Sequence, residues 1–303
     1  MEFSLSEEQE AIFDVAYSFG QENIAPFAIQ WENQGTIPKE LWGKISELGF
    51  GGIYVSEEYG GSGLSRLDAT LIFEALAMAC PSVGSFLSIH NMVGGMIDKF
   101  GSDQNKESFL PDLCSMKKIF SYCLTEPGSG SDASALKTKA TRTNEGFILN
   151  GTKSFISGGA YSNAYLTMTR TGEDGPKGIS AIIIEDPSDG LSFGAFEDKM
   201  GWKAQPTAQV QFDDCRVPSS NLIGDEGYGF TYAMAGLDGG RLNIAASALG
   251  GAQFALDSSL TYMNERKAFG KNLNQFQALQ FKLADMEVKL QTARTFLRQA
   301  AWK

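Results

Sequence analysis

The stretch of this sequence best suited to chemistry is the run YCLTEPGSGSD at residues 122–132. Its glycines let backbone N–H groups come close to a flat or anionic ligand, and its serines and threonine add hydroxyl donors. A loop of this composition also fits a hydrated linker between two elements. Composition alone therefore leaves a ligand-binding loop and a linker both open.

Few other residues offer familiar catalytic chemistry. His90 is the only histidine, which argues against a Ser-His-Asp site and excludes zinc sites built from several histidines. No motif surrounds His90, so we expect it to be buried with its hydrogen bonds satisfied. The four cysteines form no C-x-x-C pair and are predicted to be small buried residues of a reducing compartment. We expect no metal site, and an organic cofactor is the natural carrier of any difficult reaction.

Charge and hydropathy exclude further classes. The 25 lysines and arginines against 36 aspartates and glutamates give a net charge of −11, which argues against non-specific nucleic-acid binding. The N-terminus has neither the basic segment and apolar core of a signal peptide nor an arginine-rich transit-peptide face. The uncharged stretch 75–97 is interrupted by proline, glycine and asparagine, so it predicts buried helices and no membrane insertion.

The positioning elements begin with a helical segment over residues 1–120. Ser6 followed by Gln9 predicts a capping box, with the next helix burying one face. The residues expected on that face are Ile12, Val15, Ala16 and Phe19. Pro38 is expected in the first turn of a second helix, and a further helix is expected over residues 67–80.

Apolar and polar residues alternate with a period of two over residues 121–225. This pattern predicts a β domain, in the form of a small antiparallel barrel or sandwich. Asn150-Gly151 between two apolar runs predicts a hairpin with a type I′ turn. Further strands are expected at 165–169, 179–184 and 210–212.

From residue 226 the helical period returns, with one long helix expected over 228–266. A second helix carries an apolar seam at Leu279, Leu283, Met286, Leu290, Ala293 and Leu297. Bundles usually need about four helices, so we expect a helical partner that lies on another subunit or on sequence this chain lacks. The predicted fold class is α+β multidomain: an N-terminal all-α domain (1–120), a middle β domain (121–225) and an incomplete C-terminal helical bundle (226–303).

The run at 122–132 resembles the signature of the acyl-CoA dehydrogenase family of flavoproteins. Stretches in the same order agree with other parts of that family: ELGFGGI with EEYGGSGL at 47–64, NGTKSFISG at 150–158, and RKAFGK at 266–271 with Gln277. The resemblance covers essentially the whole chain. It implies an enzyme with FAD as cofactor that removes hydrogen from the α and β carbons of an acyl-CoA.

The resemblance also implies roles for individual residues. The cofactor-binding residues are Tyr122, Cys123, Leu124, Thr125, Gly130, Ser131, Phe155, Ile156, Ser157, Arg266, Phe269, Phe276 and Gln277. Of these, Ser157 is expected near the reactive ring nitrogen, and Arg266 is expected to reach the FAD pyrophosphate of a neighbouring subunit. The substrate-binding residues are Ser131, Asp238, Gly239, Gly240 and Arg241. Plainer roles stay open: strand packing for Phe155, a surface ion pair for Asp238 with Arg241, and a helix-dipole contact for Arg266.

The resemblance gives no catalytic residue in this chain. The family needs a glutamate against the substrate α-carbon, and most members carry it late in the C-terminal domain, beyond the region matched here. A minority carry it at the position of Gly240, which has no side chain, and Glu126 in the loop is not the family's base. We therefore expect a C-terminally truncated chain that lacks the catalytic glutamate and turns over poorly.

Within the family, the resemblance is nearest to members that act on isobutyryl-CoA, a step of valine degradation. It implies electron transfer to an electron-transfer flavoprotein, a homo-oligomer such as a dimer of dimers, and a place in the bacterial cytoplasm or mitochondrial matrix. Alternatives are a member specific for short straight-chain, 2-methylacyl or glutaryl substrates, a flavoprotein oxidase, and a base-less assembly protein that binds FAD or acyl-CoA.

Overall fold

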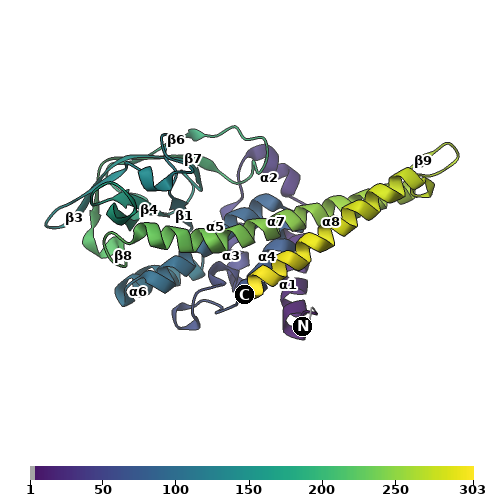
Figure 1. Cartoon of the computed structure of the whole chain (residues 1–303), viewed down its shortest axis with the longest axis horizontal. Helices are drawn as coiled ribbons and strands as arrows, with labels where there is room; N and C mark the ends of the chain where they lie inside the picture. The colour runs from purple at the N-terminus through teal and green to yellow at the C-terminus, as the bar shows by residue number, and fades with distance from the viewer. Residues whose placement is uncertain (1–3) are drawn as a thin grey trace. The chain divides into compact units, whose positions relative to one another are not determined.

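The computed structural model describes residues 4–303 and divides into two compact units (Figure 1). The first unit comprises the N-terminal segment up to Ile29, Arg66–Ser85 and Arg241–Lys303. The second comprises Gln30–Ser65 and Phe86–Gly240. The helices are α1 (Glu7–Asn23), α2 (Ala28–Gln34), α3 (Lys39–Glu47), α4 (Arg66–Ala79), α5 (Pro81–Phe100), α6 (Asp103–Cys114), α7 (Gly229–Glu265) and α8 (Gln277–Trp302).

The first helix begins as predicted. Gln9 N–H donates to the Ser6 hydroxyl oxygen over 3.2 Å, and Ser6 N–H donates to Gln9 Oε1 over 3.1 Å, which completes a capping box. The predicted buried face is wrong at Val15, which is 47 % exposed. Helix α1 buries Ala16 and Gly20 instead, because a Cβ on Gly20 would lie only 3.3 Å from Ala79 Cβ of α4. This close approach turns Val15 away from the packed face.

The two long helices predicted near the C-terminus are present as α7 and α8, which lie antiparallel and join at the hairpin β9 (Lys267–Ala268) and β10 (Lys271–Asn272) (Figure 1). The predicted seam of α8 is buried at Leu290 and Leu297, whereas Met286 is 38 % exposed. Arg294 of α8 donates from Nε to the carboxylate of Glu74 in α4 over 2.7 Å, which ties α8 to the rest of the first unit.

The uncharged stretch 75–97 forms the end of α4 and most of α5, with a break at Cys80. Pro38 sits at the N-cap of α3, one residue before the predicted position. Among residues 4–303, no helix is both long and apolar enough to cross a membrane. All four cysteines are buried and free, as expected.

The second unit is built on a mixed eight-stranded sheet, with the order β6-β7-β3-β2-β4-β5-β8 and β1 paired to β4. The strands are β1 (Phe120–Cys123), β2 (Lys139–Arg142), β3 (Gly146–Ser157), β4 (Ala164–Arg170), β5 (Ile179–Glu185), β6 (Leu191–Phe196), β7 (Thr207–Pro218) and β8 (Leu222–Ile223). The β1–β4 and β2–β4 pairs are parallel, so the sheet is not antiparallel throughout. The predicted order of helices, β domain and helices is confirmed.

The predicted hairpin at Asn150-Gly151 is wrong. Strand β3 continues through these residues and pairs with β7 on both sides of them, with a register shift between Leu149 and Gly151. Gly151 has φ +147°, and a Cβ there would lie 2.7 Å from Thr138 Cα of the approaching chain. The glycine is thus required by a bulge with close backbone approach, not by a turn.

Two apolar cores lie on opposite faces of the sheet, because successive strand residues point to opposite sides. Leu166 of β4 belongs to the core shared with Val93 of α5 and Leu110 of α6. The next residue back, Tyr165, belongs to the core shared with Leu149 of β3 and other strand residues. Strand β1 contributes Phe120 to the first core and Cys123 to the second, and the glycine-rich loop follows directly after it.

Candidate active site

The glycine-rich loop folds into a tight turn directly after β1. Glu126 N–H donates to Ser129 O over 2.9 Å, and Ser129 N–H donates back to Glu126 O over 3.1 Å. A Cβ added to Gly128 or Gly130 would meet no atom within 4 Å. The loop is therefore open on its glycine side, where a ligand can approach the backbone.

A buried ion pair ties this loop to β3. Lys153 Nζ lies 2.8 Å from Glu126 Oε1 and 3.0 Å from Leu124 O, and the side chains of the pair are 0 % and 6 % exposed. Ser154 N–H donates to Thr125 O over 2.8 Å. Two predicted flavin residues of the loop, Leu124 and Thr125, are thus held against the strand that carries the second predicted set.

Both oxygens of the Glu126 carboxylate accept hydrogen bonds within the protein. The carboxylate also accepts backbone hydrogen bonds from Lys137 over 2.6 Å and from Thr138 over 2.8 Å. Burial alone would raise the pKa of Glu126, but the Lys153 ammonium and these hydrogen bonds outweigh it and lower the pKa below its ordinary value. Glu126 is therefore an ionised group whose two oxygens are engaged by the Lys153 ammonium and two backbone N–H groups.

The sequence motifs predicted no role for Lys153. The only local signal was a lysine inside an apolar strand, close to the Asn150-Gly151 pair. A long, charged side chain in that position is either solvated or paired, and its partner lies 27 residues away in the loop.

The end of β3 carries an aromatic residue in an unusual backbone conformation. Phe155 has φ +59° and its side chain is 67 % exposed, while the register between β3 and β7 shifts between Lys153 and Ile156. Such a conformation is costly for a bulky residue and is often associated with a functional constraint. The bulge keeps Ile156 buried and presents the Phe155 ring at the surface.

Ser157 is held from two sides. Its carbonyl accepts from the Ser121 hydroxyl over 2.6 Å, and its own hydroxyl oxygen accepts a hydrogen bond from the Gln205 amide. Gln205 is only 4 % exposed and was not singled out from the sequence, because the segment before β7 carries no motif.

These residues fit a flat heteroaromatic group with a polar edge. The phenol oxygen of Tyr122 is buried without a hydrogen-bond partner among the described residues, and burial raises its pKa. Phe155 offers an exposed ring face, and Thr125, Ser131 and Ser157 supply hydroxyls. Cys123 contributes no reactive thiol, because burial raises its pKa to about 12 and keeps it protonated.

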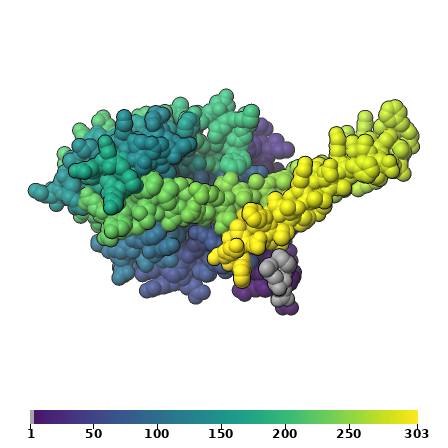
Figure 2. Space-filling view, viewed as in Figure 1, coloured from purple at the N-terminus to yellow at the C-terminus, as the bar shows by residue number. Residues whose placement is uncertain are grey.

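The other predicted residues lie on α7 and at its C-terminal turn. Asp238 and Arg241 are exposed residues of α7, three positions apart and thus on one helix face. Arg266, Phe269 and Phe276 lie in the connection from α7 to α8, Gln277 begins α8, and all four belong to the first unit. That connection forms the yellow-green tip of the helix pair (Figure 2). Phe269 there is 96 % exposed with φ +52°. The structure thus brings together the predicted residues of the loop and of β3.

His90 is a structural residue, as expected. Its Nδ1 accepts from Phe120 N–H over 3.1 Å and its Nε2 lies 3.0 Å from Leu113 O. Burial lowers the pKa of His90 to about 4, so the ring is neutral and joins α5 to the end of α6 and the start of β1.

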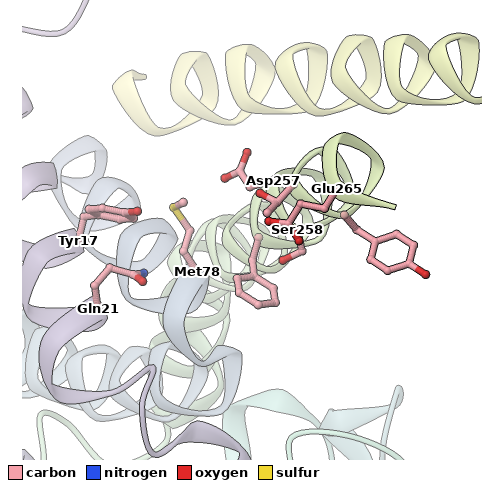
Figure 3. Close-up of a pocket in the computed structure, with 9 residues that line it drawn as sticks. Tyr17, Gln21, Met78, Asp257, Ser258 and Glu265 are labelled. Atoms are coloured by element: carbon pink, nitrogen blue, oxygen red, sulfur yellow. The ribbon is translucent and has the colours of Figure 1, made fainter. Parts of the chain in front are cut away.

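Two surface hollows of the first unit involve none of the predicted site residues. One, of about 400 Å³, is lined by Tyr17 and Gln21 of α1, Met78 of α4 and Asp257 of α7 (Figure 3). The other, of about 540 Å³, is an apolar groove between α7 and α8, with Leu249 and Leu290 in its lining. Neither contains residues matched to flavin or substrate contacts.

Comparison with known proteins defines the class. The chain matches the N-terminal domain of acyl-CoA dehydrogenases at residues 6–117, the middle domain at 121–215 and the C-terminal domain at 227–303. It is 54 % identical over 298 residues to the mitochondrial isobutyryl-CoA dehydrogenase of Dictyostelium discoideum, covering 98 % of this chain and 72 % of that protein.

Two solved structures agree. One is described as the electron transferring flavoprotein of Acidaminococcus fermentans, with TM-score 0.97, 40 % identity, and coverage of 100 % of this chain and 80 % of that one. Another, described as PigA with FAD and proline, has TM-score 0.95, 32 % identity and the same coverage. The fold is thus that of a flavoprotein oxidoreductase with FAD as its cofactor. The chain belongs to the acyl-CoA dehydrogenase family, whose enzymes act on CH–CH groups.

Proposed function

We propose that this protein dehydrogenates the α,β bond of a short branched acyl-CoA, with isobutyryl-CoA as the preferred substrate. The observation that carries the proposal is the link between the 122–131 loop, which contains Thr125 and Ser131, and β3, which carries Ser157 and the exposed Phe155 ring. The substrate assignment is supported by the name of the relative that is 54 % identical.

When bound, FAD supplies the acceptor for the hydride that leaves the substrate β-carbon. The backbone of Tyr122–Thr125 and Gly130 would line one side of its ring system, and Leu124 and Thr125 would hydrogen-bond the polar edge. Phe155 would cover the other side with its ring, and Ile156, whose side chain is buried, would contribute backbone atoms. The Ser157 hydroxyl would donate a hydrogen bond toward the ring nitrogen and so favour negative charge there.

The acyl-CoA is bound by Ser131 in the loop and by Asp238, Gly239, Gly240 and Arg241 on α7. The exposed carboxylate and guanidinium of α7 suit the polar parts of a CoA ester. Gly239 is buried, and a Cβ on Gly240 would lie 3.3 Å from Met92 Sδ, so these two residues would contact the substrate through backbone atoms alone.

The proposed assembly is a homo-oligomer, a dimer of dimers, in which the α7–α8 turn serves a neighbouring subunit. Arg266 would meet the FAD pyrophosphate there, with Phe269, Phe276 and Gln277 around it. The near-complete exposure of Phe269 supports a contact outside its own chain. Electrons pass to an electron-transfer flavoprotein, in a mitochondrial matrix or a bacterial cytoplasm.

We also propose that residues 4–303 hold no general base for the α-proton. Gly240 has no side chain, and the Glu126 carboxylate is buried against Lys153 with its oxygens engaged. These residues would then bind FAD and the acyl-CoA, and the proposed dehydrogenation would need a base from outside them to remove the α-proton.

The test is an anaerobic visible-spectrum titration of the FAD-loaded chain with isobutyryl-, butyryl-, 2-methylbutyryl- and glutaryl-CoA. We expect each bound ester to shift the flavin band without bleaching it, with the tightest binding for isobutyryl-CoA. Tighter binding of another ester would contradict the substrate assignment, and prompt bleaching would contradict the missing base. A chain that binds no ester would contradict the proposed function as a whole.

A further inference from the structure

We propose that Gln205 is a positioning residue that aims the Ser157 hydroxyl hydrogen at the flavin. The inference rests on the proposed role of Ser157 beside the reactive ring nitrogen and deepens it. It concerns a residue on a different segment, 48 positions along the chain, whose side chain reaches the same site.

The starting point is the hydrogen-bond inventory of Ser157. A serine hydroxyl has one hydrogen to donate and two lone pairs that accept. The Gln205 Nε2 group donates to Ser157 Oγ, so this contact uses a lone pair and leaves the hydrogen. Throughout residues 4–303, no acceptor takes that hydrogen. It is therefore available to an acceptor on a bound ligand.

The Gln205 side chain can orient the Ser157 hydroxyl only if the backbone of Gln205 is itself fixed in place. Lys199 Nζ donates to Gln205 O and also to Thr207 Oγ1, the latter over 2.9 Å. On the other side of the segment, Gly158 N–H donates to Pro206 O over 2.7 Å. Thr207 is the register partner of Ser157 in the β3–β7 pair. The segment 205–207 is thus pinned to the end of β3.

Burial makes the contact directional. Gln205 is 4 % exposed and its neighbour Thr207 is 7 % exposed, so water does not compete freely for the amide. Because the Gln205 amide donates to the Ser157 oxygen, the hydroxyl hydrogen points away from Gln205. A carboxylate in its place would accept the Ser157 hydrogen and turn it away from the ligand.

The experiment measures the equilibrium constant for two-electron reduction of the bound flavin by dye equilibration. It compares the FAD-loaded wild-type chain with the variants Gln205→Leu, Gln205→Glu, Ser157→Ala, Ser157→Thr and Gln205→Leu/Ser157→Ala. We expect Gln205→Leu to lower this constant by about three- to tenfold, the range of one neutral hydrogen bond. Gln205→Glu should lower it at least as much. Ser157→Thr keeps the hydroxyl and should stay within about twofold of wild type.

The double variant separates positioning from packing. If Gln205 acts through Ser157, Gln205→Leu has no further effect once Ser157 is alanine. If Gln205→Leu lowers the constant equally in both backgrounds, Gln205 does not act through Ser157 and the inference is wrong. The inference is also wrong if Ser157→Ala lowers the constant while Gln205→Leu and Gln205→Glu do not. In either case the proposed role of Ser157 still stands. No effect of Ser157→Ala overturns the proposed role of Ser157 and the inference with it.

Discussion

At the scale of single residues, His90 gives the clearest pH response. Burial lowers its pKa from 6.5 to about 4, so the folded state binds the proton less well than the unfolded chain. Its contribution to stability is present above pH 6.5 and is lost as the pH falls toward 4. The loss is about 3 kcal/mol of unfolding free energy at about 1.4 kcal/mol per pKa unit.

The check is a set of urea unfolding curves from pH 7 to pH 4, with His90→Gln as the matched control, because its amide can keep one hydrogen bond without titrating. We expect a shallower decline for the variant. Since His90 is the only histidine, an NMR titration of its ring protons in the folded chain reports on it alone. Protonation near pH 6.5 would contradict the assignment of a buried neutral ring.

Residue types indicated part of the site. The sequence motifs predicted roles for Leu124, Thr125 and Ser157, because the loop and strand signatures are local. They did not identify Lys153 or Gln205, because each acts on a residue 27 or 48 positions away. A side-chain contact of that length depends on strand register, which composition and spacing do not specify.

At the scale of elements, the Lys153–Glu126 ion pair connects the glycine-rich loop to β3. We expect Lys153→Met to lower the unfolding free energy by about 3–5 kcal/mol, because it leaves a buried carboxylate without its partner. The double variant Lys153→Met/Glu126→Gln should recover part of that loss. The same urea experiment measures both.

The matched control is Lys118→Met, which breaks the half-exposed pair with Glu185, 2.6 Å apart. Solvent screens that pair, so its loss should change stability by less than about 1 kcal/mol. Equal losses of unfolding free energy for Lys153→Met and Lys118→Met would show that the buried pair does not stabilise the connection between the loop and β3. Because the pKa of Glu126 is lowered, the stability that its ionised form contributes is lost as the pH falls below the ordinary glutamate range.

Element types followed from the sequence more reliably than pairings. The 3.6-residue period predicted α1, α4, α7 and α8, and the capping box fixed the start of α1. The Asn150-Gly151 signal predicted a turn where β3 runs on, because a local turn signal cannot reveal a twelve-residue partner strand, β7. Parallel pairing of β1 with β4 is likewise invisible in alternation alone.

At the scale of the whole molecule, the order of helices, mixed sheet and helices sets two segments of the middle region side by side as one candidate surface. The loop at 122–131 contributes open backbone, and the end of β3 contributes an aromatic ring and a hydroxyl. Our central claim is that these two segments form the flavin site of this acyl-CoA dehydrogenase family member.

The measurement that tests this claim most directly is the FAD dissociation constant of wild-type chain, Phe155→Ala and Phe254→Ala. Phe254 lies on α7, in the part assigned to the first unit, and is 57 % exposed, close to the 67 % of Phe155, so it controls for the loss of an exposed ring. We predict that Phe155→Ala weakens FAD binding by about tenfold, the scale of one aromatic contact, while Phe254→Ala stays within about twofold of wild type. Equal affinity of all three chains for FAD would contradict the account.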